Sequence, residues 1–108
     1  SVAFHRPFPG SAAYVTAKGA MLGITRSLAY ELGPDNVTVN LIAPGWVPVE
    51  RHSTAPSEAL RKLVAETPLG RHGVPAEVAG VVLLLASELS SFVTGVQLPV
   101  NGGHSFFG

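Results

Sequence analysis

The sequence has 108 residues, enough for one small domain and too few for two. Hydrophobic residues make up 46%, charged residues 13%, and seven basic side chains balance seven acidic ones without clustering, so neither a nucleic-acid surface nor an anionic-membrane surface is expected. The chain has no cysteine, which excludes disulfides and thiolate metal sites and permits a cytoplasmic location. The longest apolar run, residues 78–86, is far shorter than the roughly 20 residues that span a bilayer.

The first predicted element is a helix from Ser11, a typical N-cap residue, to about residue 32, where Gly33 and Pro34 end it. Residues 37–43 are short and rich in β-branched side chains, and they end at a Pro-Gly pair, so they predict a buried strand. Asn40 within this strand is interpreted as structural, its amide joining neighbouring backbone.

Ser57 is expected to cap a short helix that runs through Glu66. Pro75 suits the first turn of the next helix, residues 76–87, which is apolar nearly all round and is therefore predicted to be buried. A last strand is expected at 95–100. This order of elements describes the later part of an α/β domain with a parallel sheet.

Tyr14 and Lys18 are four residues apart on the first predicted helix and therefore share a face. A free phenol is a poor acid or base at neutral pH, but a nearby ammonium stabilises the phenolate. Such a phenol can protonate an alkoxide as it forms, or deprotonate an alcohol. The same spacing is also common between residues that are merely neighbours on a surface.

Ser1, Tyr14 and Lys18 have the Ser-x12-Tyr-x3-Lys spacing, and this pattern, with its flanks, resembles the short-chain dehydrogenase/reductase family. The stretch FPGSAAYVTAKGAMLGITRSLAYELGPDNVTVNLIAPGW is similar to that family's catalytic helix and following strand. The stretch PLGRHGVPAEVAGVVLLLASELSSFVTGVQLPVNGG is similar to its last helix and closing strand. The resemblance implies a Rossmann-type, doubly wound parallel sheet, of which residues 1–108 supply the C-terminal portion of a single domain.

The resemblance also implies a role for each catalytic residue. Tyr14 would be the general acid/base. Lys18 would stabilise the phenolate and hydrogen-bond the nicotinamide ribose. Ser1 would hold and polarise the substrate carbonyl. The reaction implied is NAD(P)-dependent interconversion of a carbonyl and an alcohol on a small-molecule substrate.

Pro44 and Gly45 follow the strand where the family places the nicotinamide of NAD or NADP. Family members usually have a threonine where this chain has Val49, so the hydroxyl that helps hold the carboxamide is missing, while the backbone of Val47 is still expected to contact it. Residues 46–66, beginning with Trp46 at the substrate, would form a flap over it.

The family's Gly-rich phosphate loop and catalytic asparagine do not occur in this sequence, and it has no signal peptide. We therefore expect the chain to be the C-terminal part of an enzyme, beginning at the catalytic serine, and inactive by itself. A truncated, non-catalytic remnant that serves as an oligomerisation or interaction module is the alternative. A second alternative is an epimerase or dehydratase that shares the Tyr-Lys pair.

The resemblance implies a homo-oligomer, a tetramer or a dimer, assembled through the apolar helices. Gly19 and Gly23 either let a second helix approach closely or are simply small core residues. The four histidines lie far apart without metal-ligand spacing, so no metal site is expected.

Overall fold

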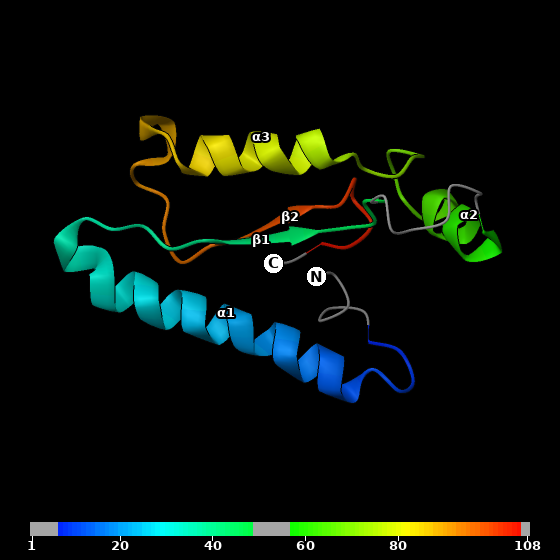
Figure 1. The fold of residues 1–108 in the computed structure, drawn as a ribbon, viewed down its shortest axis with the longest axis horizontal. Helices are drawn as coiled ribbons and strands as arrows, with labels where there is room; N and C mark the ends of the chain where they lie inside the picture. The colour runs from blue at the N-terminus through cyan, green and yellow to red at the C-terminus, as the bar shows by residue number, and fades with distance from the viewer. Residues whose placement is uncertain (1–6, 49–56, 107–108) are drawn as a thin grey trace.

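The computed structural model describes residues 7–48 and 57–106. In this part of the chain, strands β1 (Leu41–Pro44) and β2 (Gln97–Val100) pair in parallel, with Leu41 opposite Gln97 and Pro44 opposite Val100. Helix α1 (Ala12–Leu32) lies on one face of this sheet and helix α3 (Pro75–Leu85) on the other (Figure 1). Helix α2 (Glu58–Ala65) lies beyond the carboxyl ends of the strands (Figure 1). The predicted α/β order of elements is confirmed.

Helix α1 begins where Ser11 predicts, but the serine side chain does not cap it. The Ser11 hydroxyl donates to the carbonyl oxygen of Phe8 and accepts from the Phe8 amide at 3.1 Å, so it closes the preceding turn instead. At the other end the backbone stays right-handed at Gly33 and continues into the 3-10 turn η2 (Gly33–Asp35). Asn36, with φ of 59°, is the left-handed residue that ends this turn.

Strand β1 begins at Leu41 and is shorter than predicted, and Val39 and Asn40 make hydrogen bonds outside the strand pairing. The Val39 amide donates to the hydroxyl of Thr94 at 3.0 Å, and the Gly95 amide donates to the Val39 carbonyl at 2.8 Å. Asn40 donates through its side chain to the Val93 carbonyl at 2.9 Å. The structural interpretation of Asn40 is therefore confirmed.

The two later helices begin as predicted. The Ser57 hydroxyl accepts a hydrogen bond from the Leu60 amide at 3.1 Å, which caps α2. Pro75 is the first residue of α3. An amide at this position would have no partner within the helix, so the helix loses no hydrogen bond because proline lacks an N–H. The 3-10 turn η3 (Glu88–Ser90) follows α3 and leads toward β2.

The core of the described chain is small, with Ala43 of β1 completely buried and Ala29 of α1 nearly so. The prediction that the helix at 76–87 is buried is wrong for these residues, since α3 contains no buried residue. Only its inner side contacts β1 and β2, which leaves Val82, Leu83 and Leu84 exposed. None of the helices in the described ranges is both long and apolar enough to cross a bilayer.

Candidate active site

The first turns of α1 bring the phenol and the ammonium together. Lys18 lies one turn after Tyr14, and its Nζ is 5.6 Å from the centre of the Tyr14 ring, within the range of a cation–π contact. Tyr14 is 47% exposed in this chain. The helical period predicted this shared face, and the structure confirms the geometry.

The segment after β1 turns close against the end of β2. The Gly45 amide donates to the Val100 carbonyl at 3.0 Å, which extends the parallel pairing by one bond. A Cβ atom added at Gly45 would lie 2.8 Å from the Cα of Asn101, so a side chain here would push the two segments apart. The glycine therefore fixes how near Trp46 and Val47 stay to the carboxyl end of the sheet.

A hollow of about 370 Å³ lies at this end of the sheet, on the α3 side. Val47 lines it, together with the apolar side chains of Leu69 and Val78. Its polar lining consists of Arg71, Glu77, Asn101 and Ser105. Among the sequence-predicted site residues in the described ranges, Val47 alone lines this hollow.

Tyr14 and Lys18 belong to α1, which covers the face of the sheet opposite α3. The first turns of α1 nevertheless lie at the same end of the molecule as the carboxyl ends of β1 and β2 (Figure 1). The structure thus brings the Tyr14–Lys18 pair and the segment Pro44–Val47 to one end of the fold, and does not bring Tyr14 to the hollow. Ser1 and Val49 lie outside the described residues.

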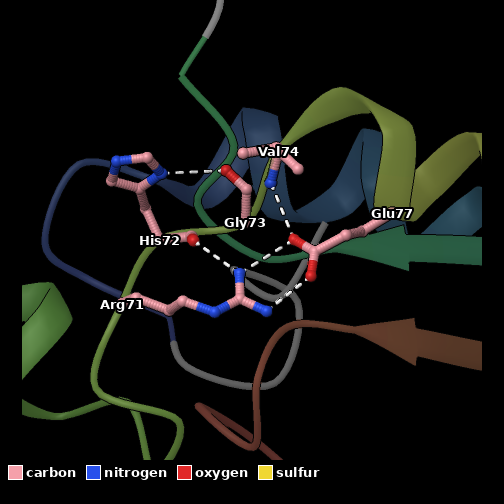
Figure 2. A network of polar contacts seen from close by, with 5 residues as sticks. All are labelled: Arg71, His72, Gly73, Val74 and Glu77. Atoms are coloured by element: carbon pink, nitrogen blue, oxygen red, sulfur yellow. Dashed lines mark hydrogen bonds and ion pairs between the residues drawn. The ribbon is translucent and has the colours of Figure 1, made fainter.

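The loop before α3 is fixed by a network that sequence reasoning missed (Figure 2). Both terminal nitrogens of Arg71 donate to the carboxylate of Glu77, at 3.0 and 2.5 Å, and the Val74 amide donates to the same carboxylate at 2.9 Å. Arg71 also donates to the His72 carbonyl at 3.1 Å. Hydrogen bonds from Arg71 and Val74 lower the pKa of Glu77 to about 2.

Part of this network carries a readable signal. Glu77 is the third residue of a helix that begins at Pro75, and a glutamate there commonly reaches back to the N-cap amide. Arg71 is six residues away along an irregular loop, so no helical or strand period relates it to Glu77.

Asn101 organises the turn after β2. Its side-chain nitrogen donates to the carbonyl and the hydroxyl of Ser105, at 2.8 and 3.1 Å, and its oxygen accepts from the Gly103 amide at 3.0 Å. Gly102 and Gly103 both have positive φ, which the turn requires. No group of three or more His, Asp or Glu side chains that could hold a metal occurs within residues 7–48 and 57–106.

Comparisons with known proteins agree with this architecture. The family model described as enoyl-(acyl carrier protein) reductase matches residues 1–105. A 3-oxoacyl-[acyl-carrier-protein] reductase of Aquifex aeolicus is 47% identical over 94 residues, which cover 87% of this chain and 38% of the relative.

Solved structures extend the similarity to the fold. A short-chain dehydrogenase/reductase of Serratia marcescens superposes with a TM-score of 0.85 and 38% identity, covering 93% of this chain and 40% of the other. A 3-oxoacyl-[acyl-carrier protein] reductase of Brucella melitensis, solved with bound NAD, superposes with a TM-score of 0.82 and 43% identity, covering 95% and 37%. This chain thus spans about two fifths of the length of these proteins, and its elements are part of a Rossmann-type α/β fold. The chain belongs to the short-chain dehydrogenase/reductase family.

Proposed function

We propose that residues 1–108 are the C-terminal part of a single Rossmann-type domain in an NAD(P)-dependent oxidoreductase that interconverts a carbonyl and an alcohol. The observation that carries this proposal is the Tyr14–Lys18 pair on α1, with the ammonium 5.6 Å from the ring centre. The Aquifex and Brucella relatives, both 3-oxoacyl reductases by name, support the reaction class.

Tyr14 is the proposed general acid/base. In the reducing direction its hydroxyl protonates the alkoxide oxygen, and in the oxidising direction the phenolate removes the proton from the alcohol. Lys18 is the proposed cationic partner of this hydroxyl, since its Nζ lies 5.6 Å from the ring centre. Ser1, which precedes the described residues, is proposed to hold and polarise the substrate carbonyl.

The residues present fit the nicotinamide end of NAD or NADP. The absence of a side chain at Gly45 keeps the backbone of Pro44–Val47 close to the end of the sheet, where the Val47 backbone is proposed to hold the carboxamide. Lys18 is proposed to bind the nicotinamide ribose, and Val49 takes the place of the family's threonine. When bound, the cofactor would supply the hydride for reduction or accept it in oxidation, while the protein supplies orientation and charge.

The substrate is proposed to be a small carbonyl or alcohol held against Ser1, Tyr14 and Trp46, with residues 46–66 as a flap over it. The proposed assembly is a homo-oligomer, a tetramer or a dimer, and the exposed apolar side chains of α3 support it. The proposed location is the cytoplasm, which a chain without cysteine permits.

The test is made on the full-length protein, whose true length is first established by mass spectrometry. Oxidation of NADH and of NADPH is followed by absorbance with a panel of ketones and aldehydes, and the reverse reaction with the corresponding alcohols. We expect turnover with at least one cofactor and one carbonyl class. Failure to bind either cofactor, together with self-association, would instead favour a non-catalytic interaction module.

A further inference from the structure

The loop between α2 and α3 connects the two segments that follow the strands. At its start, the Leu69 amide donates to the Gly102 carbonyl at 3.1 Å, which fastens the loop to the turn after β2. At its end, the Gly73 amide donates to the Trp46 carbonyl at 3.0 Å, which fastens it to the segment after β1. The position of this loop therefore bears directly on where Trp46 and Val47 lie.

Gly73 contacts the segment after β1 through more than one atom. A Cβ atom placed on Gly73 would lie 3.1 Å from the Cγ2 of Val47 and 3.7 Å from the Trp46 carbonyl oxygen. The Gly73 backbone therefore already packs closely against Val47. A displacement of Gly73 by a few tenths of an ångström would alter both the hydrogen bond and this contact.

Gly73 is in turn held by its neighbours on both sides (Figure 2). Arg71 makes two hydrogen bonds to Glu77, and Val74 makes a third. One carboxylate on the first turn of α3 therefore holds the residue two positions before Gly73 and the residue directly after it. The His72 Nδ1 also lies 2.9 Å from the Gly73 carbonyl oxygen. A bidentate pair fixes orientation as well as distance, unlike a single ionic contact.

We propose that Arg71 and Glu77 are a positioning pair, which sets the place of Gly73 and, through it, the backbone of Trp46 and Val47 at the nicotinamide end of the cofactor site. The inference rests on the proposed function, which assigns Val47 to the carboxamide. Neither side chain takes part in proton or hydride transfer.

The test uses the full-length enzyme with Glu77→Gln, which keeps the size of the side chain and removes its charge. The dissociation constants of NADH or NADPH, whichever binds more tightly, and of the matching ADP-ribose fragment that lacks nicotinamide are measured by calorimetry. We expect about a fivefold weaker affinity for the whole cofactor, which corresponds to the loss of one hydrogen bond of about 1 kcal/mol between the protein and the carboxamide. The affinity for the fragment, which has no carboxamide, should not change. Equal weakening of both ligands, or of neither, overturns the proposal.

A second measurement needs no cofactor. Hydrogen exchange of the Gly73 amide, followed in the ligand-free enzyme, should be faster in Glu77→Gln than in the wild type. Glu88→Gln is the matched control, because it makes the same chemical change at an exposed residue of η3. Unchanged exchange at Gly73 in the Glu77 variant contradicts the proposed coupling.

Arg71 tests the pair from its other side, with the Glu77–Val74 bond left in place. Arg71→Gln should reproduce the loss of cofactor affinity, and Arg71→Lys should restore part of it by supplying one charged donor. The exposed Arg26 of α1 gives the control Arg26→Gln. An equal loss in the glutamine and lysine variants of Arg71 contradicts a role of the charged hydrogen bonds. The proposed function fails separately, if the wild type binds neither NADH nor NADPH or if Tyr14→Phe retains normal turnover.

Discussion

The side-chain amide of Asn40 donates a hydrogen bond to the carbonyl oxygen of Val93, which is 2.9 Å away and 53 residues further along the chain. The side-chain oxygen of the same residue accepts from the Val96 amide at 3.3 Å. One side chain thus takes the place of ladder hydrogen bonds just before β1 and β2 begin to pair. A residue without both a donor and an acceptor cannot replace it.

Asn40→Ala should lower the free energy of unfolding of the full-length protein by about 1–3 kcal/mol, because it leaves the backbone groups of Val93 and Val96 without this partner. Thr38→Ala, at an exposed position two residues earlier, is the control and should change stability by less than about 0.5 kcal/mol. Urea unfolding measures both. Equal small effects in the two variants would mean that other contacts hold the strands.

The carboxylate of Glu77 should make stability depend on pH in the acid range. Hydrogen bonds from Arg71 and from the Val74 amide, with the charges of Arg71 and His72, lower its pKa from 4.5 to about 2 in the folded protein. A lowered pKa means that the unfolded chain binds the proton more tightly, so the contribution is complete above about pH 5 and disappears as pH falls toward 2.

We expect the difference in urea midpoint between the wild type and Glu77→Gln to be largest at neutral pH and to narrow between pH 4.5 and pH 2. Glu88→Gln should show no such narrowing. A difference that stays constant down to the acid limit would indicate that the ionised carboxylate is not what stabilises the loop.

Tyr14→Phe should reduce turnover of the full-length enzyme at least about a hundredfold, the scale of general acid–base catalysis. The variant keeps the ring beside Lys18 and removes only the hydroxyl. Tyr30→Phe, at the far end of the same helix and 88% exposed, should leave turnover unchanged. Near-normal rates in a folded Tyr14→Phe enzyme would remove Tyr14 from the mechanism.

Val49→Thr should tighten binding of the nicotinamide cofactor by up to about 1 kcal/mol, the net value of one hydrogen bond. This prediction rests on the family resemblance, because threonine is usual at this position. Val49 itself lies outside the described residues. Calorimetric titration of the full-length protein tests it, with Val37→Thr as the control for an exposed valine elsewhere. Weaker binding would show that the segment is built differently here.

Local sequence signals predicted the elements well because each signal is itself local. Ser57 caps α2 through its own hydroxyl, and Pro75 begins α3, as their residue types indicate. The neighbouring positions of Tyr14 and Lys18 follow in the same way from the helical period.

Features that depend on a distant partner were missed or wrong. The β-branched residues at 37–39 predict a strand, but the Val39 amide is bonded by the side chain of Thr94, which no local pattern reveals. The Arg71–Glu77 pair depends on the path of a loop that turns at Gly70 with φ of 65°. The apolar sequence of α3 indicates that the helix packs against a nonpolar surface. It does not indicate whether that surface belongs to the same chain.

The exposed apolar side of α3 leads to the last prediction, which concerns assembly. Leu83 is 71% exposed and lies between Val82 and Leu84, which are exposed as well, and Phe92 after η3 is fully exposed. Exposed apolar side chains are often covered at a contact surface, and homo-oligomers commonly use one surface twice about a two-fold axis. Light scattering of the full-length protein at micromolar concentration should therefore give the mass of a dimer or a tetramer.

Leu83→Glu should shift that mass to a smaller species, because association would bury an unpaired carboxylate against apolar side chains. Ala65→Glu adds the same charge at the exposed end of α2, which lies beyond the carboxyl ends of the strands and away from the outer side of α3, and it should leave the mass unchanged (Figure 1). If the wild type is monomeric, the proposed assembly is wrong, and α3 is covered within one chain. If the wild type is oligomeric and Leu83→Glu stays so, the contact between subunits lies on another face, for which the exposed Ile24 of α1 is the next position to change.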